Sequence, residues 1–130
     1  HPDFKALSFM HPPINSVMAF MAQKSLATLM KAERSTDKLF AEHFNIPVGD
    51  GATVPAVLYS PVGIGSDAPC LIYYPGGGFV FPGAPYHYTL AKQYAVKANC
   101  RVLFVQYRLA PTYRFPVPVD DCYNAYCWAI

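Results

Sequence analysis

Three consecutive glycines, Gly76, Gly77 and Gly78, follow the short apolar run 70–74 and Pro75. Successive residues without side chains let backbone N–H groups converge on a cavity, and such a cavity can hold an anion or a developing oxyanion. The segment is not a dinucleotide-binding GxGxxG, because no helix is expected to begin at the third glycine. Nor is it a P-loop, because no Gly-Lys-Ser/Thr follows. The glycines therefore predict either an oxyanion site or a tight turn.

The glycine segment belongs to a predicted strand–helix–strand unit. Residues 70–74 and 102–105 are continuous apolar runs, which is typical of buried strands. Apolar residues at helical spacing predict a helix between them: Leu90, Ala91, Tyr94, Ala95 and Ala98. A strand, a helix and a strand in this order predict a right-handed βαβ unit with two parallel strands.

Further elements are expected on both sides of this unit. Upstream, Asn15 can cap an amphipathic helix, and residues 40–48 and 53–60 read as a hairpin around Gly49-Asp50-Gly51. Downstream, Asp120 or Asp121 can cap a last helix. Apolar residues at helical spacing define one face of each of these helices. In the first helix they are Met18, Met21, Ala22, Leu26 and Leu29. In the last helix they are Cys122, Ala125, Tyr126, Ala129 and Ile130. The methionines fit either ordinary packing or an adaptable, substrate-facing lid.

Composition narrows the class of protein. Of the 130 residues 53% are hydrophobic and 14% charged, which excludes a disordered chain and indicates that a large apolar surface faces something other than water. Scattered basic residues and a net charge of +2 argue against nucleic acid, and no apolar run reaches the ~20 residues of a membrane span. The four cysteines, at positions 70, 100, 122 and 127, lack metal-binding spacing. We therefore expect reduced, buried thiols and a cytoplasmic location. A bridge between Cys70 and Cys100 is the alternative.

Three blocks of residues carry a family resemblance. The segment 73–79, Tyr-Tyr-Pro-Gly-Gly-Gly-Phe, is followed by 107–111, Tyr-Arg-Leu-Ala-Pro, and then by Phe115-Pro116 and Asp120-Asp121. This order and spacing resemble the hormone-sensitive-lipase-like esterases of the α/β-hydrolase fold, with their HGGGF loop, Tyr-Arg-Leu-Ala-Pro block and Phe-Pro-x-x-x-(Asp/Glu)-Asp helix start. His87 also falls where this family commonly has a histidine. The resemblance is close over 71–130 and loose upstream.

The resemblance implies an oxyanion hole formed by the backbone N–H groups of Gly77 and Gly78, with Gly76 shaping the turn. It also places four residues near the acyl or alcohol pocket, namely Phe79, Val80, Phe81 and Tyr86. Ordinary packing is the alternative role for these side chains. Arg108, next to Tyr107, is expected to hold its loop to Asp120 or Asp121 rather than to touch substrate. No metal or organic cofactor is implied, because ester hydrolysis on this fold needs only the catalytic triad, water and the oxyanion hole.

The sequence departs from the family pattern in two ways. Pro75 stands where the family has the histidine of HGGG, and since proline fixes φ and has no N–H, we expect an altered loop rigidity with the glycine donors retained. In addition, no G-x-S-x-G nucleophile elbow occurs, and no histidine falls where the family has its catalytic base. The chain is therefore expected to lack the nucleophile, to be the N-terminal part of a larger esterase, and to leave an open sheet edge at 71–74.

These observations predict an α/β protein with two parts, a cap-helix region at 1–36 and the N-terminal half of an α/β-hydrolase core at 37–130. The expected activity of the complete protein is hydrolysis of small or medium acyl esters. The expected partners are the small-molecule ester and a C-terminal fragment of the same protein that carries the serine, the acid and the histidine. Two alternatives remain open. One is a non-catalytic small-molecule binder or pseudoenzyme, since the superfamily includes the gibberellin receptors, and the other is a purely structural fragment.

Overall fold

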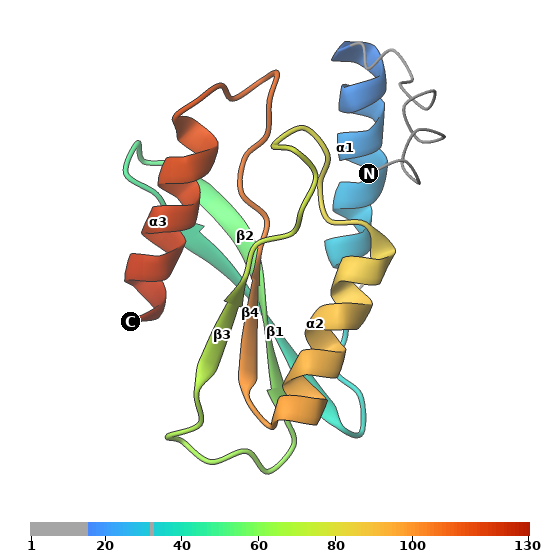
Figure 1. Cartoon of the computed structure of the whole chain (residues 1–130), viewed down its shortest axis with the longest axis vertical. Coiled ribbons are helices and arrows are strands. Elements are labelled where there is room, and N and C mark those ends of the chain that lie inside the picture. The colour runs from blue at the N-terminus through green and yellow to red at the C-terminus, as the bar shows by residue number, and fades with distance from the viewer. Residues whose placement is uncertain (1–15, 32) are drawn as a thin grey trace, which may run out of the picture.

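The computed structural model describes residues 16–31 and 33–130 and shows a four-stranded mixed sheet with helices on both faces (Figure 1). The strand order is β1-β2-β4-β3. The strands are β1 (Leu39–Pro47), β2 (Thr53–Pro61), β3 (Cys70–Tyr73) and β4 (Arg101–Val105), and the helices are α1 (Ser16–Lys31), α2 (Pro85–Ala98) and α3 (Val117–Ala129). The α/β fold predicted from the sequence is confirmed.

The first two strands form the predicted hairpin. They pair antiparallel from Leu39 opposite Pro61 to Pro47 opposite Thr53. The turn closes with the amide of Val48 donating to the carbonyl oxygen of Ala52 at 2.9 Å, and Gly51 adopts a φ of +80°. Glycine suits this position because an L side chain is disfavoured in the left-handed region.

The strand–helix–strand unit is also present. Strands β3 and β4 pair in parallel, and β4 lies between β3 and the antiparallel β2. Helix α2 connects the two parallel strands; it begins with Pro85 and ends where Asn99 adopts a φ of +48°. Proline is favourable in the first turn because its missing N–H has no partner there in any helix.

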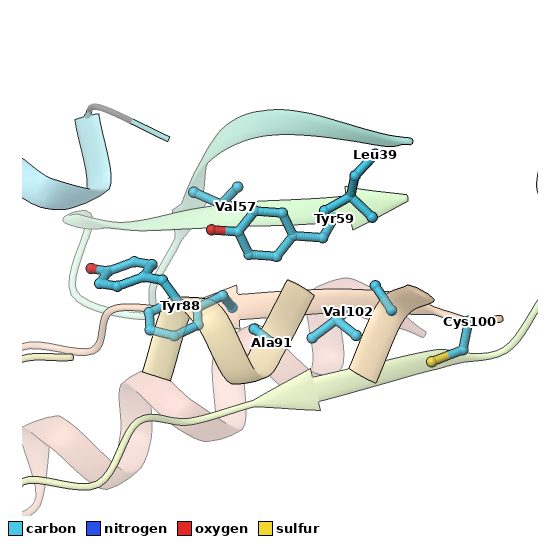
Figure 2. Close-up of a cluster of buried hydrophobic side chains, with 9 residues drawn as sticks. Leu39, Val57, Tyr59, Tyr88, Ala91, Cys100 and Val102 are labelled. Carbon is cyan, nitrogen blue, oxygen red and sulfur yellow. The ribbon is translucent and has the colours of Figure 1, made fainter. Parts of the chain in front are cut away.

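Alternate residues of the central strands fill two cores (Figure 2). On the face covered by α2, side chains of β2 and β4 pack against Tyr88 and Ala91 of that helix. On the face covered by α3, the intervening residues pack against Ala125. Both faces of the strands are buried, so these strands read as continuous apolar runs rather than as an alternating pattern. The strand residues of the first core are Leu39, Val57, Tyr59, Val102 and Phe104, and those of the second are Ile46, Val54, Ala56, Leu103 and Val105.

Helix α3 begins earlier than the acidic pair predicts. Its first residue is Val117, so Asp120 lies in the first turn and Asp121 inside the helix, and neither one caps it. Proline residues account for the earlier start, since Pro118 is compatible with the first turn of a helix. The prediction of an aspartate cap is therefore wrong. Asp121 is instead fully buried, where its carboxylate binds Arg108.

Helix α1 shows a different exposed face from the one predicted. The described residues Met18 and Met21 have 49% and 65% of their surface exposed, whereas Ala19 is buried and Gln23 is half-buried. Of the two interpretations of the methionines, ordinary packing is therefore wrong within the described residues, and the substrate-facing lid stays a prediction. Asn15 and the side chains of Ala22, Leu26 and Leu29 lie outside the described residues.

Strand β3 is one of the two edge strands of the sheet in the described part of the chain and pairs with β4 only. Its residue Leu71 has 43% of its surface exposed, and the neighbouring Cys70 is exposed as well. An edge strand presents unpaired backbone groups that can accept a further strand. The expectation of an open edge at residues 71–74 agrees with this topology.

Candidate active site

The glycine segment and the Tyr-Arg-Leu-Ala-Pro block lie at the same end of the sheet. The first connects β3 to α2 and the second connects β4 to α3, and both leave the carboxyl ends of parallel strands (Figure 1). The amide of Ala110 donates to the carbonyl oxygen of Phe79 at 2.8 Å and joins the two connections directly. The carboxyl edge of a parallel pair is where open α/β sheets place their ligands.

The glycines adopt a tight turn that few other residues could form. The amides of Val80 and Phe81 both donate to the carbonyl oxygen of Gly77, at 3.1 and 2.9 Å. A Cβ atom on Gly77 would lie 2.9 Å from the carbonyl carbon of Phe81 and closer still to its oxygen. Gly78 and Phe79 follow with φ values of +60° and +61°. Steric overlap therefore requires glycine at position 77, and backbone conformation favours it at position 78.

Hydrogen bonds to two carbonyl groups set the direction of two glycine amides. Tyr107 donates its hydroxyl hydrogen to the carbonyl oxygen of Pro75 at 2.7 Å, while the carbonyl oxygen of Gly77 accepts the two amides just described. In a trans peptide the N–H points opposite to the preceding carbonyl. The N–H groups of Gly76 and Gly78 therefore point away from these partners. Within residues 16–31 and 33–130, the amides of the three glycines, Gly77 included, donate to no protein acceptor, so they remain available to an anion.

His87 braces the start of α2 beside the glycines. Its Nδ1 accepts the amide hydrogen of Ala84 at 3.0 Å, and its own amide donates to the carbonyl oxygen of Ala84 at 2.9 Å. Its Nε2 faces Gly76, and its ring centroid is 3.9 Å from that of Tyr86. Burial lowers the pKa of His87, because a charged imidazolium loses hydration in the interior. The ring is thus held neutral, as an acceptor at Nδ1.

Arg108 holds the carboxylate of Asp121, one of the two partners expected for it. Its guanidinium makes a bidentate contact with Asp121, with Nη2–Oδ1 at 2.6 Å and Nε–Oδ2 at 2.9 Å, and its amide also donates to Oδ2. The partner is Asp121 and not Asp120. A second ion pair, at 2.6 Å, joins Arg108 to Asp50 in the hairpin turn. Hydrogen bonds to Asp121 and then to Asp50 raise the pKa of Arg108, so it stays charged.

A cavity of about 180 Å³ opens between the two connections. Of the four residues predicted near a substrate pocket, Phe81 lines this cavity. The other three do not: Val80 is half-buried beside it, while Phe79 and Tyr86 are exposed. The lining consists of Gln23, Pro75, Phe81, Pro82, Gly83, Gln106, Tyr107, Arg108, Leu109, Thr112 and Tyr113.

Gln23 of helix α1 is the site residue that sequence reasoning missed. Its Nε2 donates to the carbonyl oxygen of Val80 at 2.9 Å and to that of Ala110 at 2.8 Å. These partners lie 57 and 87 residues away along the chain. The only local signal is a polar residue directly after Met21 and Ala22 in the expected apolar face.

The cysteines take no part in this site. All four cysteines are free, but only Cys100 is buried, so the prediction of buried thiols is wrong for the exposed Cys70 and Cys127. The bridge between Cys70 and Cys100 is not formed. Among the residues that the structure describes, no group of three His, Cys, Asp or Glu side chains could hold a metal ion.

Comparison with known proteins gives the class. A family model described as the alpha/beta hydrolase fold matches residues 71–130. The chain is 38% identical over 55 residues to hormone-sensitive lipase of Bos taurus, covering 42% of this chain and 7% of that protein. It is 40% identical over 83 residues to ethyl acetate hydrolase of Pseudomonas putida, covering 62% and 26% respectively.

The solved structures agree with this class. An esterase of Pyrobaculum calidifontis superposes with a TM-score of 0.70 and 31% identity, over 92% of this chain and 38% of that one. The protein is thus an α/β hydrolase by fold. Within that class, the chain is similar to the hormone-sensitive-lipase-like esterases and covers an N-terminal portion of their fold, spanning well under half the length of these relatives. No helix in the described residues is long and apolar enough to cross a membrane.

Proposed function

We propose that the complete protein is a serine carboxylester hydrolase of small or medium acyl esters, and that this chain supplies its oxyanion hole. The observation that carries the proposal is the glycine turn. Among the described residues the amides of Gly77 and Gly78 have no protein acceptor, and the turn lies between Pro75 and Phe81, which both line the cavity. Esterase and lipase relatives support the reaction class.

The proposed reaction begins with attack of a serine Oγ on the carbonyl carbon of the ester, while a histidine takes the serine proton. The carbonyl oxygen becomes an oxyanion, and the amides of Gly77 and Gly78 donate hydrogen bonds to it. When the tetrahedral intermediate collapses, the alkoxide leaves with the proton from the histidine, and water then releases the acid by the same steps. The serine, its acid and its histidine are proposed to lie on the C-terminal part of the same protein, with which this chain is expected to associate.

We propose that in the complete protein these amides act in a site with limited access to water, which would strengthen their interaction with developing charge. Loss of one such donor lowers kcat by about 10²–10³ in enzymes of this kind. A fixed turn is also important, because donors that are already oriented need no reorganisation during the reaction. The hydrogen bonds from Val80 and Phe81 orient the Gly78 amide here, and the one from Tyr107 holds the peptide at the start of the turn.

The test compares two glycine variants of the complete protein with p-nitrophenyl butyrate as the substrate. Gly77→Ala places a Cβ against the backbone of Phe81, so the turn must move, and kcat should fall by at least about 100-fold. Gly65→Ala is the matched control. No atom lies within 4 Å of its added Cβ, and it lies in the loop before β3, outside the glycine turn, so kcat should stay close to that of the parent.

The same experiment separates catalysis from simple binding. If the parent protein hydrolyses no ester but binds the substrate, the non-catalytic binder replaces the esterase as the function. Equal activity of the Gly77→Ala protein and its parent, with both folded by circular dichroism, would exclude the glycine turn as the oxyanion hole.

A further inference from the structure

Gln23 is placed where it can act on the glycine turn without touching it. The side chain reaches out of α1 and uses both hydrogens of one amide nitrogen, one for Val80 and one for Ala110. The two carbonyl oxygens belong to different connections, one after β3 and the other after β4. Gln23 also lines the cavity, where it is half-buried.

The hydrogen bonds of these two partners lead back to the glycines. Val80 accepts from Gln23 at its carbonyl and donates its amide to the carbonyl oxygen of Gly77 at 3.1 Å. Ala110 likewise accepts from Gln23 and donates its amide to the carbonyl oxygen of Phe79 at 2.8 Å. The result is a closed ring of hydrogen bonds that contains the Gly77-Gly78-Phe79 backbone.

The Gly77 carbonyl in this ring belongs to the same peptide unit as the Gly78 amide. The peptide is planar, so any rotation of the carbonyl turns the N–H by the same angle. Gln23 therefore affects the direction of a proposed oxyanion donor through Val80. Chains of hydrogen bonds also polarise and reinforce one another in a site partly shielded from water.

We propose that Gln23 is a positioning residue, through which helix α1 holds the glycine turn in its oxyanion-binding conformation. This inference rests on the proposed function. A glutamine suits the role because its amide nitrogen carries two hydrogens. A glutamate of equal length has none when ionised and would place a negative charge against two carbonyl oxygens.

The test uses Gln23→Glu and Gln23→Leu in the complete protein, with Gln93→Glu on the exposed side of α2 as the control. Both Gln23 variants should lower kcat for p-nitrophenyl butyrate by about tenfold, less than the loss of a donor itself, with KM within about twofold. A change confined to kcat is expected because the turn is needed in the transition state and not for binding of the ground state.

Amide hydrogen exchange gives a second readout that does not depend on activity. The amides of Val80, Phe81 and Ala110 are hydrogen-bonded within the ring and should exchange faster in both Gln23 variants. The amide of Gln106, which donates to Pro55 at 2.9 Å outside the ring, should exchange at the same rate in all proteins.

The outcomes separate this inference from the proposed function. An active parent with an unchanged kcat and unchanged exchange in both Gln23 variants would overturn it. Faster exchange at Gln106 as well would show general loosening and also overturn it. If the parent hydrolyses no ester, the proposed function fails, and the exchange of the three ring amides alone decides whether Gln23 holds the turn.

Discussion

Asp121 accepts three groups of Arg108 at once, namely Nε, Nη2 and the backbone amide. The carboxylate is fully buried, while the arginine side chain keeps 14% of its surface exposed. A fork of donors that matches a carboxylate is the strongest form of ion pair that side chains make. This contact fixes α3 to the connection after β4, directly behind the wall of the candidate cavity.

We expect Asp121→Asn to destabilise the protein by about 3 kcal/mol, the lower end for breaking a buried pair, because Arg108 would lose its buried countercharge. The measurement is the free energy of unfolding in urea. Asp50→Asn is the matched control, since Asp50 contacts the same guanidinium but is exposed, and it should cost much less. Equal losses in the two variants would contradict a dominant role for the buried pair.

Tyr107→Phe should lower kcat by about tenfold with little change in KM, because it removes the hydroxyl that holds the Pro75 carbonyl and so the Gly76 peptide. Burial raises the pKa of Tyr107, so the hydroxyl remains a donor across the working pH range. Steady-state kinetics with p-nitrophenyl butyrate provide the measurement. Tyr94→Phe on the exposed side of α2 is the control, and an equal effect of both variants would count against this hydrogen bond.

Much of the sheet could be predicted because its determinants are local. The Gly49-Asp50-Gly51 turn and the two apolar runs depend on neighbours along the chain, and both the hairpin and the parallel pair are confirmed. The same local reasoning failed for α3. Asp121 has the side chain of a helix cap, but Arg108, 13 residues earlier, binds it inside the helix. Local propensity was overridden there by a tertiary ion pair.

The site itself could be predicted only in part. The glycines and Arg108 stand in motifs, so their neighbourhood was visible in the sequence. Gln23 was not, because its partners Val80 and Ala110 come close to it only in the folded chain. The packing interpretation of Met18 and Met21 failed for a related reason. Helical spacing shows which residues share a face, but it does not show whether that face meets the rest of the chain.

His87 should make stability fall as the pH drops. Its pKa is lowered in the folded protein, while the unfolded chain has the ordinary value of about 6.5. Below that value the unfolded state binds a proton that the folded state does not, so acid favours unfolding, and above about pH 7 the contribution disappears. Protonation at Nδ1 would also break the hydrogen bond from Ala84.

The measurement for this prediction is the urea midpoint at pH 7.5 and pH 5.5. The drop between the two should be smaller in His87→Gln than in the parent, because the variant has no imidazole to titrate. An identical drop in both proteins would assign the pH dependence to other groups.

The size of the cavity predicts the preferred length of the acyl chain. The cavity of about 180 Å³ is small beside the volumes of about 300–1,000 Å³ that hold drug-sized ligands. We therefore expect kcat/KM to be highest for p-nitrophenyl esters with short acyl chains, and to fall for the dodecanoate. Phe81→Ala should shift the optimum to longer chains, whereas Phe79→Ala, outside the lining, should not. A flat profile across chain lengths would contradict a substrate bound in this cavity.

The most direct test of the central claim is to label the complete protein with a fluorophosphonate, which reacts with activated serines, and to locate the label by peptide mass spectrometry. If the complete protein is a serine hydrolase, one serine is labelled, in a G-x-S-x-G sequence outside residues 1–130. Gly77→Ala should slow the labelling, because the probe places a phosphoryl oxygen in the oxyanion hole. A label on a serine within this chain, or ester hydrolysis without any labelled serine, would contradict that claim.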